Sequence, residues 1–401
     1  MPKVSAIITT YNSARYLPQA IESALSQSYK DYELLVVDDG STDNTRDIVS
    51  AFGDRVNYFW KEHSERSDTR NFASRIAQGD LIAFLDSDDV WLPEKLSIQV
   101  AAFETYPEAV LAHVSARLVN EDLAPVSWWG FDILGKDVGQ NRLYQPKNEI
   151  VQGSVIMPTT AMIRRDMLLK SGGFDPEIFW GEDWDLWIRM SRMGAFIEIP
   201  RVLSFYRTYG MDKELKKRSS DLYLDRCLYI IGKAASSNPD QITTSDRRKI
   251  EANIYAHHGM ANFQSGNPDR GTASLLQASE LDPTIKQEQN LVDLLEYVSR
   301  RIWRDTRDEN QVKKFITVAI ANLPKGFSLP AGGVRQILAR MYMSEVFQHY
   351  CDGNPRIVLS ALAAGLTNDP SWVFNRGVVS IGLKLIQQYI FKPQRSNKPN
   401  A

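Results

Sequence analysis

The stretch Ile82-Ala83-Phe84-Leu85-Asp86-Ser87-Asp88-Asp89 decides the fold of the first part of this chain. Its apolar run has the length of a strand and ends on three acids within four residues. We expect a buried strand whose end delivers carboxylates to the edge of a core. Carboxylates crowded there repel one another unless a cation neutralises them. A divalent ion held against a diphosphate is the candidate that suits such a site.

Strand and helix patterns alternate on both sides of this stretch. Short β-rich apolar runs lie at residues 4–9, 32–37, 56–60 and 81–85. Helical patterns lie between and after these runs, at residues 13–27, 43–52, 68–78 and 93–106. Continuous apolar strands that alternate with helices predict an α/β fold, with a mainly parallel sheet covered by helices on both faces.

Three of the predicted strands end in polar clusters. The clusters are Thr9-Thr10-Tyr11-Asn12, Asp38-Asp39-Gly40-Ser41 and Asp86-Ser87-Asp88-Asp89. In parallel α/β sheets a ligand lies beyond the carboxyl ends of the strands, where the strand order reverses. We therefore expect the three clusters to converge on one ligand.

The two outer acids of the last cluster suit a metal and a nucleotide. Asp86 and Asp88 are two residues apart, so an extended backbone points both to one side. One can ligate Mg²⁺ or Mn²⁺, while the other holds the ribose or a metal-bound water. The alternative is a solvated acidic turn ahead of the helix that starts near Pro93.

The first two clusters suit a nucleoside. Tyr11 offers a ring on which a base can stack, Thr9 and Asn12 offer hydrogen bonds, and Asp39 can accept the imide N–H of a pyrimidine. Alternatively, these polar residues cap helices, and the two roles are compatible. Arg70 can pair with Asp39 or with a phosphate, although an arginine in the first turn of a helix is often only a solvated charge.

A third candidate group lies at Phe179-Trp180-Gly181-Glu182-Asp183-Trp184-Asp185-Leu186-Trp187. Asp183 precedes an amphipathic helix, whose dipole favours an ionised carboxylate. Such a carboxylate in an aromatic cleft can take the proton of an attacking hydroxyl. The alternative is a helix cap with the tryptophans in the core. Tyr206-Arg207 could bring a cation to a leaving phosphate, or could form a surface strand end.

Composition excludes several classes of protein. The chain has 401 residues, 43% hydrophobic and 24% charged, with a formal net charge of −2. This balance gives no sign of a general nucleic-acid binder. Only two cysteines are present, which excludes a disulfide framework or a Cys-based zinc site and fits a reducing compartment. The sequence has neither a signal-peptide pattern nor an apolar stretch of membrane-span length, so we expect a cytoplasmic protein that is at most peripheral on the membrane.

The second part of the chain is predicted to be helical and repetitive. Gly266-Asn267-Pro268, Leu275 and Asp282-Pro283 recur at the same spacings as Gly353-Asn354-Pro355, Leu362 and Asp369-Pro370. This pattern resembles the tetratricopeptide helix–turn–helix unit. We predict a first domain at 1–210, a helical linker at 211–245, a helical-repeat domain at 246–392 and a disordered tail at 393–401. Residues 120–150 are predicted to be loop lining a cleft.

The first part of the chain resembles a family 2 glycosyltransferase with a GT-A-type, Rossmann-like fold. The blocks that carry the resemblance are residues 4–12, 33–43, 86–89, 181–183 and 206–207, in the order of that family. The resemblance implies that Thr9, Tyr11 and Asp39 bind the nucleoside, assisted by Asn12. It also implies that Arg70 supports the nucleotide, Asp88 holds the metal, Asp86 contacts the ribose or metal beside Ser87, and Asp183 is the catalytic base.

The resemblance has departures. Thr69-Arg70-Asn71 stands where the family often has Ala-Arg-Asn, and Thr208-Tyr209 follows the Tyr-Arg pair where the family often has histidine. The Gln-x-x-Arg-Trp signature of processive polysaccharide synthases is absent. A polymerising channel enzyme is therefore not expected.

These features together predict a metal-dependent inverting enzyme that moves one sugar from a nucleotide-sugar, such as a UDP-sugar or dTDP-sugar, to a glycan or lipid-linked hydroxyl. Trp128, Trp129 and Trp180 could stack on acceptor sugars, with Glu182 and Trp184 beside them; packing into the core is the alternative for each tryptophan. The helical part could bind a protein partner or self-associate, and a C-terminal helix at 380–392 could touch a membrane surface. Two other classes remain: a helical-repeat scaffold with a non-catalytic transferase-like domain, and a nucleotidyltransferase, although the lysine-bearing Gly-rich loop of the latter is absent.

Overall fold

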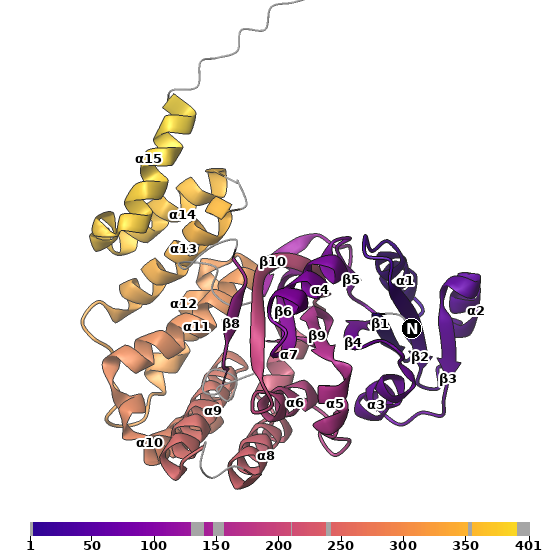
Figure 1. Cartoon of the computed structure of the whole chain (residues 1–401). Coiled ribbons are helices and arrows are strands. Elements are labelled where there is room, and N and C mark those ends of the chain that lie inside the picture. Colours follow the sequence, from indigo (N-terminus) through magenta and orange to yellow (C-terminus); the bar gives the residue numbers. More distant parts are fainter. Residues whose placement is uncertain are drawn as a thin grey trace, which may run out of the picture. The chain divides into compact units, whose positions relative to one another are not determined.

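A computed structural model describes residues 3–129, 140–146, 156–209, 211–237, 242–351 and 355–390 of the chain (Figure 1). Within this range the side chains of residues 127–129, 211–214, 348–349, 351 and 385–390 are not described. The chain divides into two compact units, residues 1–254 and 255–401, each of which is described by itself.

The first unit is built on a sheet that is parallel in its first half and mixed in its second. Its strands are β1 (Val4–Thr10), β2 (Tyr32–Asp38), β3 (Asn57–Trp60), β4 (Leu81–Asp86), β5 (Val90–Trp91), β6 (Ala109–Val119), β7 (Pro125–Trp129), β8 (Arg142–Tyr144), β9 (Ala161–Arg164) and β10 (Ala195–Arg207). Their order is β3-β2-β1-β4-β9-β6-β10-β5, with β7 on β6 and β8 on β10 (Figure 1). The strands β3, β2, β1 and β4 are mutually parallel. β9 runs antiparallel to both β4 and β6.

Helices cover both faces of this sheet (Figure 1). The helices of the first unit are α1 (Leu17–Leu25), α2 (Thr45–Ser50), α3 (Arg66–Ile76), α4 (Lys95–Thr105), α5 (Arg165–Lys170), α6 (Glu182–Met190), α7 (Met211–Arg218), α8 (Asp221–Ser237) and the start of α9 (Thr244–Gln264), with short 3-10 turns η1 (Gly53–Arg55) and η3 (Pro158–Thr160). Successive residues of β1 point to opposite faces. Ile7 packs in one core cluster with residues of α3, α6 and α8, while Ala6 and Ile8 pack in another with residues of α1, α2 and α4. The predicted α/β sheet between two helical layers is confirmed.

The region predicted to be loop, residues 120–150, contains two strands. β7 pairs with β6 and β8 pairs with β10, both antiparallel. A strand of three to five residues has too few positions for alternation to stand out from a loop pattern. Whether such a short segment forms a strand depends on pairing with strands that are distant in sequence. A local sequence pattern carries no information about that pairing.

The boundary of the first unit differs from the one predicted at residue 210. The structure places it between Ile254 and Tyr255, within α9. The boundary lies there because apolar side chains of α8 pack into the core of the first unit. Ile230 and Ile231 of α8 are fully buried in the same cluster as Trp187 of α6. Residues of α8 and of the start of α9 therefore complete the core of the first unit and do not form a linker.

The second unit is helical throughout its described residues. Beyond α9 it contains α10 (Pro268–Leu281), η4 (Pro283–Lys286), α11 (Glu288–Thr306), α12 (Glu309–Ala321), α13 (Gly333–Cys351), α14 (Pro355–Asn368), η5 (Pro370–Phe374) and α15 (Arg376–Ile390). None of the helices in the described part of the chain has the length and apolar character needed to cross a membrane.

The two sequence repeats of the second unit have the same local structure. In each, a long helix precedes a helix of 14 residues that begins at the proline, and a 3-10 turn follows that begins after an aspartate. Gly353 and Asn354 of the second repeat lie outside the described residues. Asp282 accepts the Thr284 N–H at 2.9 Å, and Asp369 accepts the Ser371 N–H at 3.0 Å. The internal repeat is therefore structural as well as sequential, while its relation to tetratricopeptide units stays a prediction.

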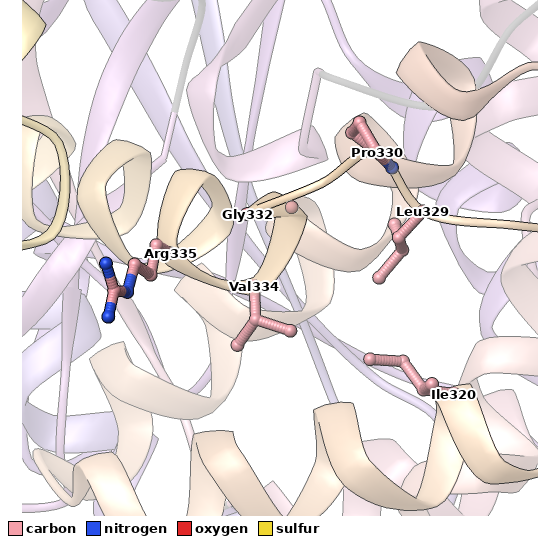
Figure 2. A pocket seen from close by; sticks show the side chains of 7 residues that line it. Ile320, Leu329, Pro330, Gly332, Val334 and Arg335 are labelled. Carbon is pink, nitrogen blue, oxygen red and sulfur yellow. The ribbon is translucent and has the colours of Figure 1, made fainter.

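A cavity of about 650 Å³ lies in the second unit between α12 and the start of α13 (Figure 2). Its lining residues are Ile320, Leu329, Pro330, Gly332, Gly333, Val334 and Arg335. Figure 2 shows the side chains of Ile320, Leu329 and Val334 turned toward a common space, whereas that of Arg335 points away. With no acid, histidine or hydroxyl in this lining, the cavity offers no groups for catalysis.

Candidate active site

The register of the sheet brings the predicted strand ends to one edge. Thr9 of β1 lies opposite Asp86 of β4, and Thr10 lies opposite Asp38 of β2. The chain runs outward from β1 through β2 to β3 on one side, and β4 lies on the other, so the strand order reverses between β1 and β4. The three polar clusters are therefore neighbours at the position where ligands bind in such sheets.

A fourth strand end contributes to the same edge. β3 is paired in parallel with β2, with Trp60 opposite Asp38, so residues 61–65 follow it directly beside Asp39. The buried Asp39 carboxylate accepts Lys61 Nζ at 2.7 Å and Thr69 Oγ1 at 2.6 Å. It also accepts the backbone N–H groups of Ser64 and Glu65, both at 3.1 Å. Burial opposes ionisation, but these hydrogen bonds outweigh it and hold the pKa of Asp39 below its ordinary value.

Tyr11 lies on the exposed side of this edge, stacked on His63. The two ring centroids are 4.2 Å apart at an interplanar angle of 18°, and 46% of Tyr11 is exposed. His63 Nδ1 lies 2.8 Å from an oxygen of Asp39. Tyr11 and Asp39, the residues predicted to bind a base, are thus linked through one imidazole.

Asn12 has a structural role in the turn after β1. Its φ is 47°, its N–H donates to Ser41 Oγ at 2.9 Å, and its Oδ1 accepts the Thr42 N–H at 2.8 Å. These bonds tie the loop after β1 to the loop after β2. Thr9 is half-buried beside them. A nucleotide contact by Asn12 or Thr9 stays a prediction.

Glu65 holds a strained backbone conformation next to Asp39. Its φ of 77° and ψ of 163° lie in a region that is nearly reserved for glycine and costs about 1–3 kcal/mol for other residues. Glu65→Gly is therefore expected to raise the free energy of unfolding of the first unit by about 1 kcal/mol, after the added freedom of the unfolded chain is subtracted. Urea unfolding followed by tryptophan fluorescence measures this change.

Glu62→Gly is the matched control for this substitution. Glu62 is exposed on the same loop and lies outside the positive-φ region. Glycine there should lower stability, because it only adds freedom to the unfolded chain. An equal loss in the two variants would contradict strain at Glu65.

Arg70 is a buried cation that bonds to two acidic side chains. It is only 1% exposed, and it donates to Asp86 Oδ1 at 2.6 Å and to Glu182 Oε1 at 2.9 Å. It does not pair with Asp39, one of the two partners expected from the sequence. Because Asp86 ends β4 and Glu182 begins α6, Arg70 joins the strand-end cluster to the third candidate group.

The two acids at the start of α6 have different surroundings. Gly181, with φ of 81°, forms the turn before the helix, and a Cβ there would lie 2.9 Å from Ile230 Cδ1. Glu182 is buried, and its Oε1 also accepts Arg66 at 3.4 Å. Asp183 is half-buried; burial and the charge of Glu182 outweigh the cation of Arg70 and raise the pKa of Asp183 to about 6. Asp183 is therefore the acid of this pair that is poised to exchange a proton near neutral pH.

Asp86 and Asp88 provide carboxylates for a divalent ion. Both are half-buried; burial and the charge of Asp86 raise the pKa of Asp88, whose Oδ2 accepts Tyr209 Oη at 2.6 Å. No group of three or more histidine, cysteine or acidic side chains with metal-site geometry occurs among the described residues. Mg²⁺ is commonly held by one or two carboxylates together with substrate phosphates and water. The two carboxylates, of which Asp86 also bonds to Arg70, therefore fit an ion that arrives with a diphosphate.

Comparison with known proteins gives likenesses for the first part of the chain. Residues 5–172 match the family model described as glycosyl transferase family 2. The chain carries a family 2 glycosyltransferase domain. An uncharacterised glycosyltransferase of Rickettsia typhi is 28% identical over 205 residues, 48% of this chain and 60% of that protein. The chain thus spans less than two thirds of that relative.

Two further proteins are similar to parts of the chain. A UDP-Glc:α-D-GlcNAc-diphosphoundecaprenol β-1,3-glucosyltransferase of Escherichia coli is 43% identical over 124 residues, 30% of this chain and 49% of that protein. The crystal structure of S. aureus TarS 1–349 in complex with UDP-GlcNAc superposes with a TM-score of 0.53 at 18% identity, covering 79% of this chain and 90% of that chain. The latter likeness supports the GT-A-like fold.

The remaining predicted residues of the glycosyltransferase domain are placed as follows. Ser87 is buried between Asp86 and Asp88, and Trp184 is buried in the hydrophobic core, which was the alternative role for it. Trp180 is half-buried, with Lys217 Nζ 5.4 Å from its ring centroid. The side chains of Trp128 and Trp129 lie outside the described residues.

Arg207 does not project into the site as an exposed cation. It is 2% exposed, donates to Gln19 Oε1 at 2.8 Å and lies 4.2 Å from the centroid of the Tyr16 ring. Its role toward a leaving phosphate stays a prediction.

Several residues of the candidate site were not predicted from the sequence. Lys61 and His63 follow β3, and the strand-end reasoning applied to the other three strands would have included them. Thr69 is one helical position before Arg70. Tyr209 lies two residues after Arg207, at the end of β10, and only the fold brings it to Asp88.

Proposed function

We propose that the chain transfers one sugar from a nucleotide-sugar to a hydroxyl group, with inversion at the anomeric carbon. The observation that carries this proposal is the chain of contacts Asp86–Arg70–Glu182, which fixes the strand-end carboxylates relative to Asp183. One buried arginine thereby connects the carboxylates that we propose for the metal and diphosphate to the acid pair in which the pKa of Asp183 is raised to about 6. Inverting transfer requires one base and one leaving group, and this arrangement supports both.

The reaction would be a single displacement. The acceptor hydroxyl oxygen bonds to the anomeric carbon while its proton passes to a carboxylate oxygen of Asp183. The bond from that carbon to the phosphate oxygen breaks, and the nucleoside diphosphate leaves with the electron pair. Asp86 and Asp88 would hold Mg²⁺ or Mn²⁺, which supplies positive charge against the diphosphate. Arg70 keeps Asp86 and Glu182 in place.

A uridine donor suits the residues at the base subsite. Tyr11 presents an aromatic ring, and Asp39 is held ionised, so it accepts an N–H but cannot donate. Uracil offers that N–H at its imide. The E. coli relative, by its name, uses UDP-Glc and a lipid-linked diphosphate acceptor. We extend both classes to this chain as part of the proposal, which places its work at a membrane surface.

UDP-sugar hydrolysis without an acceptor tests the donor half of the proposal. We expect wild-type protein to hydrolyse UDP-Glc or UDP-GlcNAc slowly with MnCl₂ and not with EDTA. Asp88→Ala should weaken Mn²⁺-dependent UDP binding about tenfold or more, because it removes a carboxylate from the ion. Calorimetry with UDP measures this effect.

Asp80→Ala is the matched control for the donor test. Asp80 is an exposed acid next to the opposite end of β4, so its loss should leave UDP binding unchanged. UDP binding that is equally tight with Mn²⁺ and with EDTA would contradict metal dependence and favour a non-catalytic scaffold.

The pH dependence of transfer follows from the raised pKa of Asp183. Because the base must be ionised to accept a proton, kcat/KM should be level above pH 7 and fall about tenfold per unit below pH 6. Initial rates between pH 5 and pH 8 measure the profile, and UDP affinity measured in parallel separates loss of the base from loss of donor binding. A flat profile down to pH 5 would contradict the assignment.

A further inference from the structure

His63 makes the two contacts that the proposed function assigns to the base of the donor. Its ring stacks on Tyr11 with a centroid distance of 4.2 Å. Its Nδ1 lies 2.8 Å from Asp39 Oδ2 and 3.1 Å from the main-chain carbonyl oxygen of Asp39, with which it forms a hydrogen bond. An imide-bearing base at this position would use the same ring face and the same carboxylate oxygen.

The hydrogen bonds of the Asp39 carboxylate leave one acceptor position that a base could use. Oδ1 accepts Lys61, Thr69 and the N–H of Ser64. A carboxylate oxygen has about two lone-pair sites, so Oδ1 is fully used. Oδ2 accepts the N–H of Glu65, and its remaining site is the one that His63 occupies.

The space between the rings also excludes a base. Stacked rings lie about 3.5 Å apart, so a base held between Tyr11 and His63 would require ring centroids on the order of 7 Å apart. The observed separation is 4.2 Å. His63 is therefore not one wall of a sandwich in this conformation. The His63 side chain is 41% exposed, so solvent lies beside the ring and it can turn outward.

We propose that the His63 imidazole fills the base subsite of the free protein and is displaced by the base of the nucleoside diphosphate. This inference rests on the proposed uridine donor. His63 then sets donor affinity, because every binding event must break its contacts with Tyr11 and Asp39. It also favours a base that replaces both contacts at once, with an aromatic face for Tyr11 and an N–H for Asp39.

The test is UDP binding by calorimetry, with MnCl₂ present, to wild type and His63→Ala. The substitution should tighten binding about three- to tenfold, because the base no longer has to displace the imidazole from Tyr11 and from the Asp39 carboxylate. Asp39 should remain ionised, since its four other donors are kept. His63→Gln, which can still donate to Asp39 but cannot stack, should show a smaller gain and serves if the alanine variant folds poorly. Glu62→Ala on the same loop should bind like wild type.

Proton NMR gives a readout that does not depend on affinity. The His63 ring protons, assigned by their loss in His63→Ala, should lie upfield in the free protein because of the Tyr11 ring current. Saturating UDP should move them downfield. Unchanged or further upfield resonances, or binding by His63→Ala that is equal to or weaker than wild type, would overturn the inference while leaving the uridine-donor proposal standing. Absence of UDP binding by wild type would overturn both.

Discussion

Asp183→Asn is expected to lower kcat for glycosyl transfer about 1,000-fold while UDP affinity changes less than about twofold. Asparagine keeps the shape of the side chain and an oxygen that can accept the Trp184 N–H, which Asp183 now accepts at 2.8 Å. It cannot take a proton from an acceptor hydroxyl. The proposed donor contacts lie on other elements, at the ends of β1, β2 and β4. Steady-state kinetics with UDP calorimetry on the same preparation measures both quantities.

Glu182→Gln is the matched control for the base. Glu182 is the adjacent acid, but its carboxylate is used by Arg70 and Arg66. Its replacement should reduce stability more than it reduces kcat. If Glu182→Gln abolished transfer while Asp183→Asn stayed active, the two acids would have to exchange roles.

Arg70→Met is expected to lower the free energy of unfolding of the first unit by about 3–5 kcal/mol. Removal of one member of a buried ionic group leaves the other charges uncompensated, and the loss has this size. Two carboxylates, those of Asp86 and Glu182, would lose their shared cation. Urea unfolding measures the loss, provided that the transition of the first unit is followed separately from that of the helical unit.

Two further variants serve as a control and as a partial rescue for Arg70→Met. Arg75→Met changes an exposed arginine on the same helix and should cost little. Arg70→Met with Glu182→Gln should recover part of the lost stability, because one stranded charge is removed. A stable Arg70→Met protein that binds UDP weakly would instead identify Arg70 as a nucleotide contact.

Much of the first unit was predictable because its strands are continuous and apolar. β1, β2 and β4 lie in the middle of the sheet between two helical layers, so both of their faces are apolar and each stands out in the sequence. β5 has two residues and β9 has four. Their membership depends on pairing with β10 and with β4 and β6, which are distant in sequence. Local periodicity carries no information about such pairing.

The acidic residues of the candidate site could be predicted from the sequence, but their hydrogen-bond partners could not. Strand ends and a helix start identify Asp39, Asp86, Asp88 and Asp183 as polar groups at the ends of apolar elements. The partner of Arg70 could not be chosen, because Glu182 lies 112 residues away and only the packing of α6 brings it near. The different pKa values of neighbouring acids follow from burial and from nearby charges, which the sequence does not report.

The continuous helix α9 crosses the boundary between the two units, and this has a consequence for protein production and for evolution. A truncated gene that stops at residue 210 would encode the first unit without α8. The hydrophobic surface around Trp187 would then be exposed to solvent and would promote aggregation. A viable expression cassette for that unit has to include the codon for Ile254. Genetic recombination that joins the first unit to a different tail would face the same limit, because a breakpoint upstream of α8 would remove part of the first unit itself.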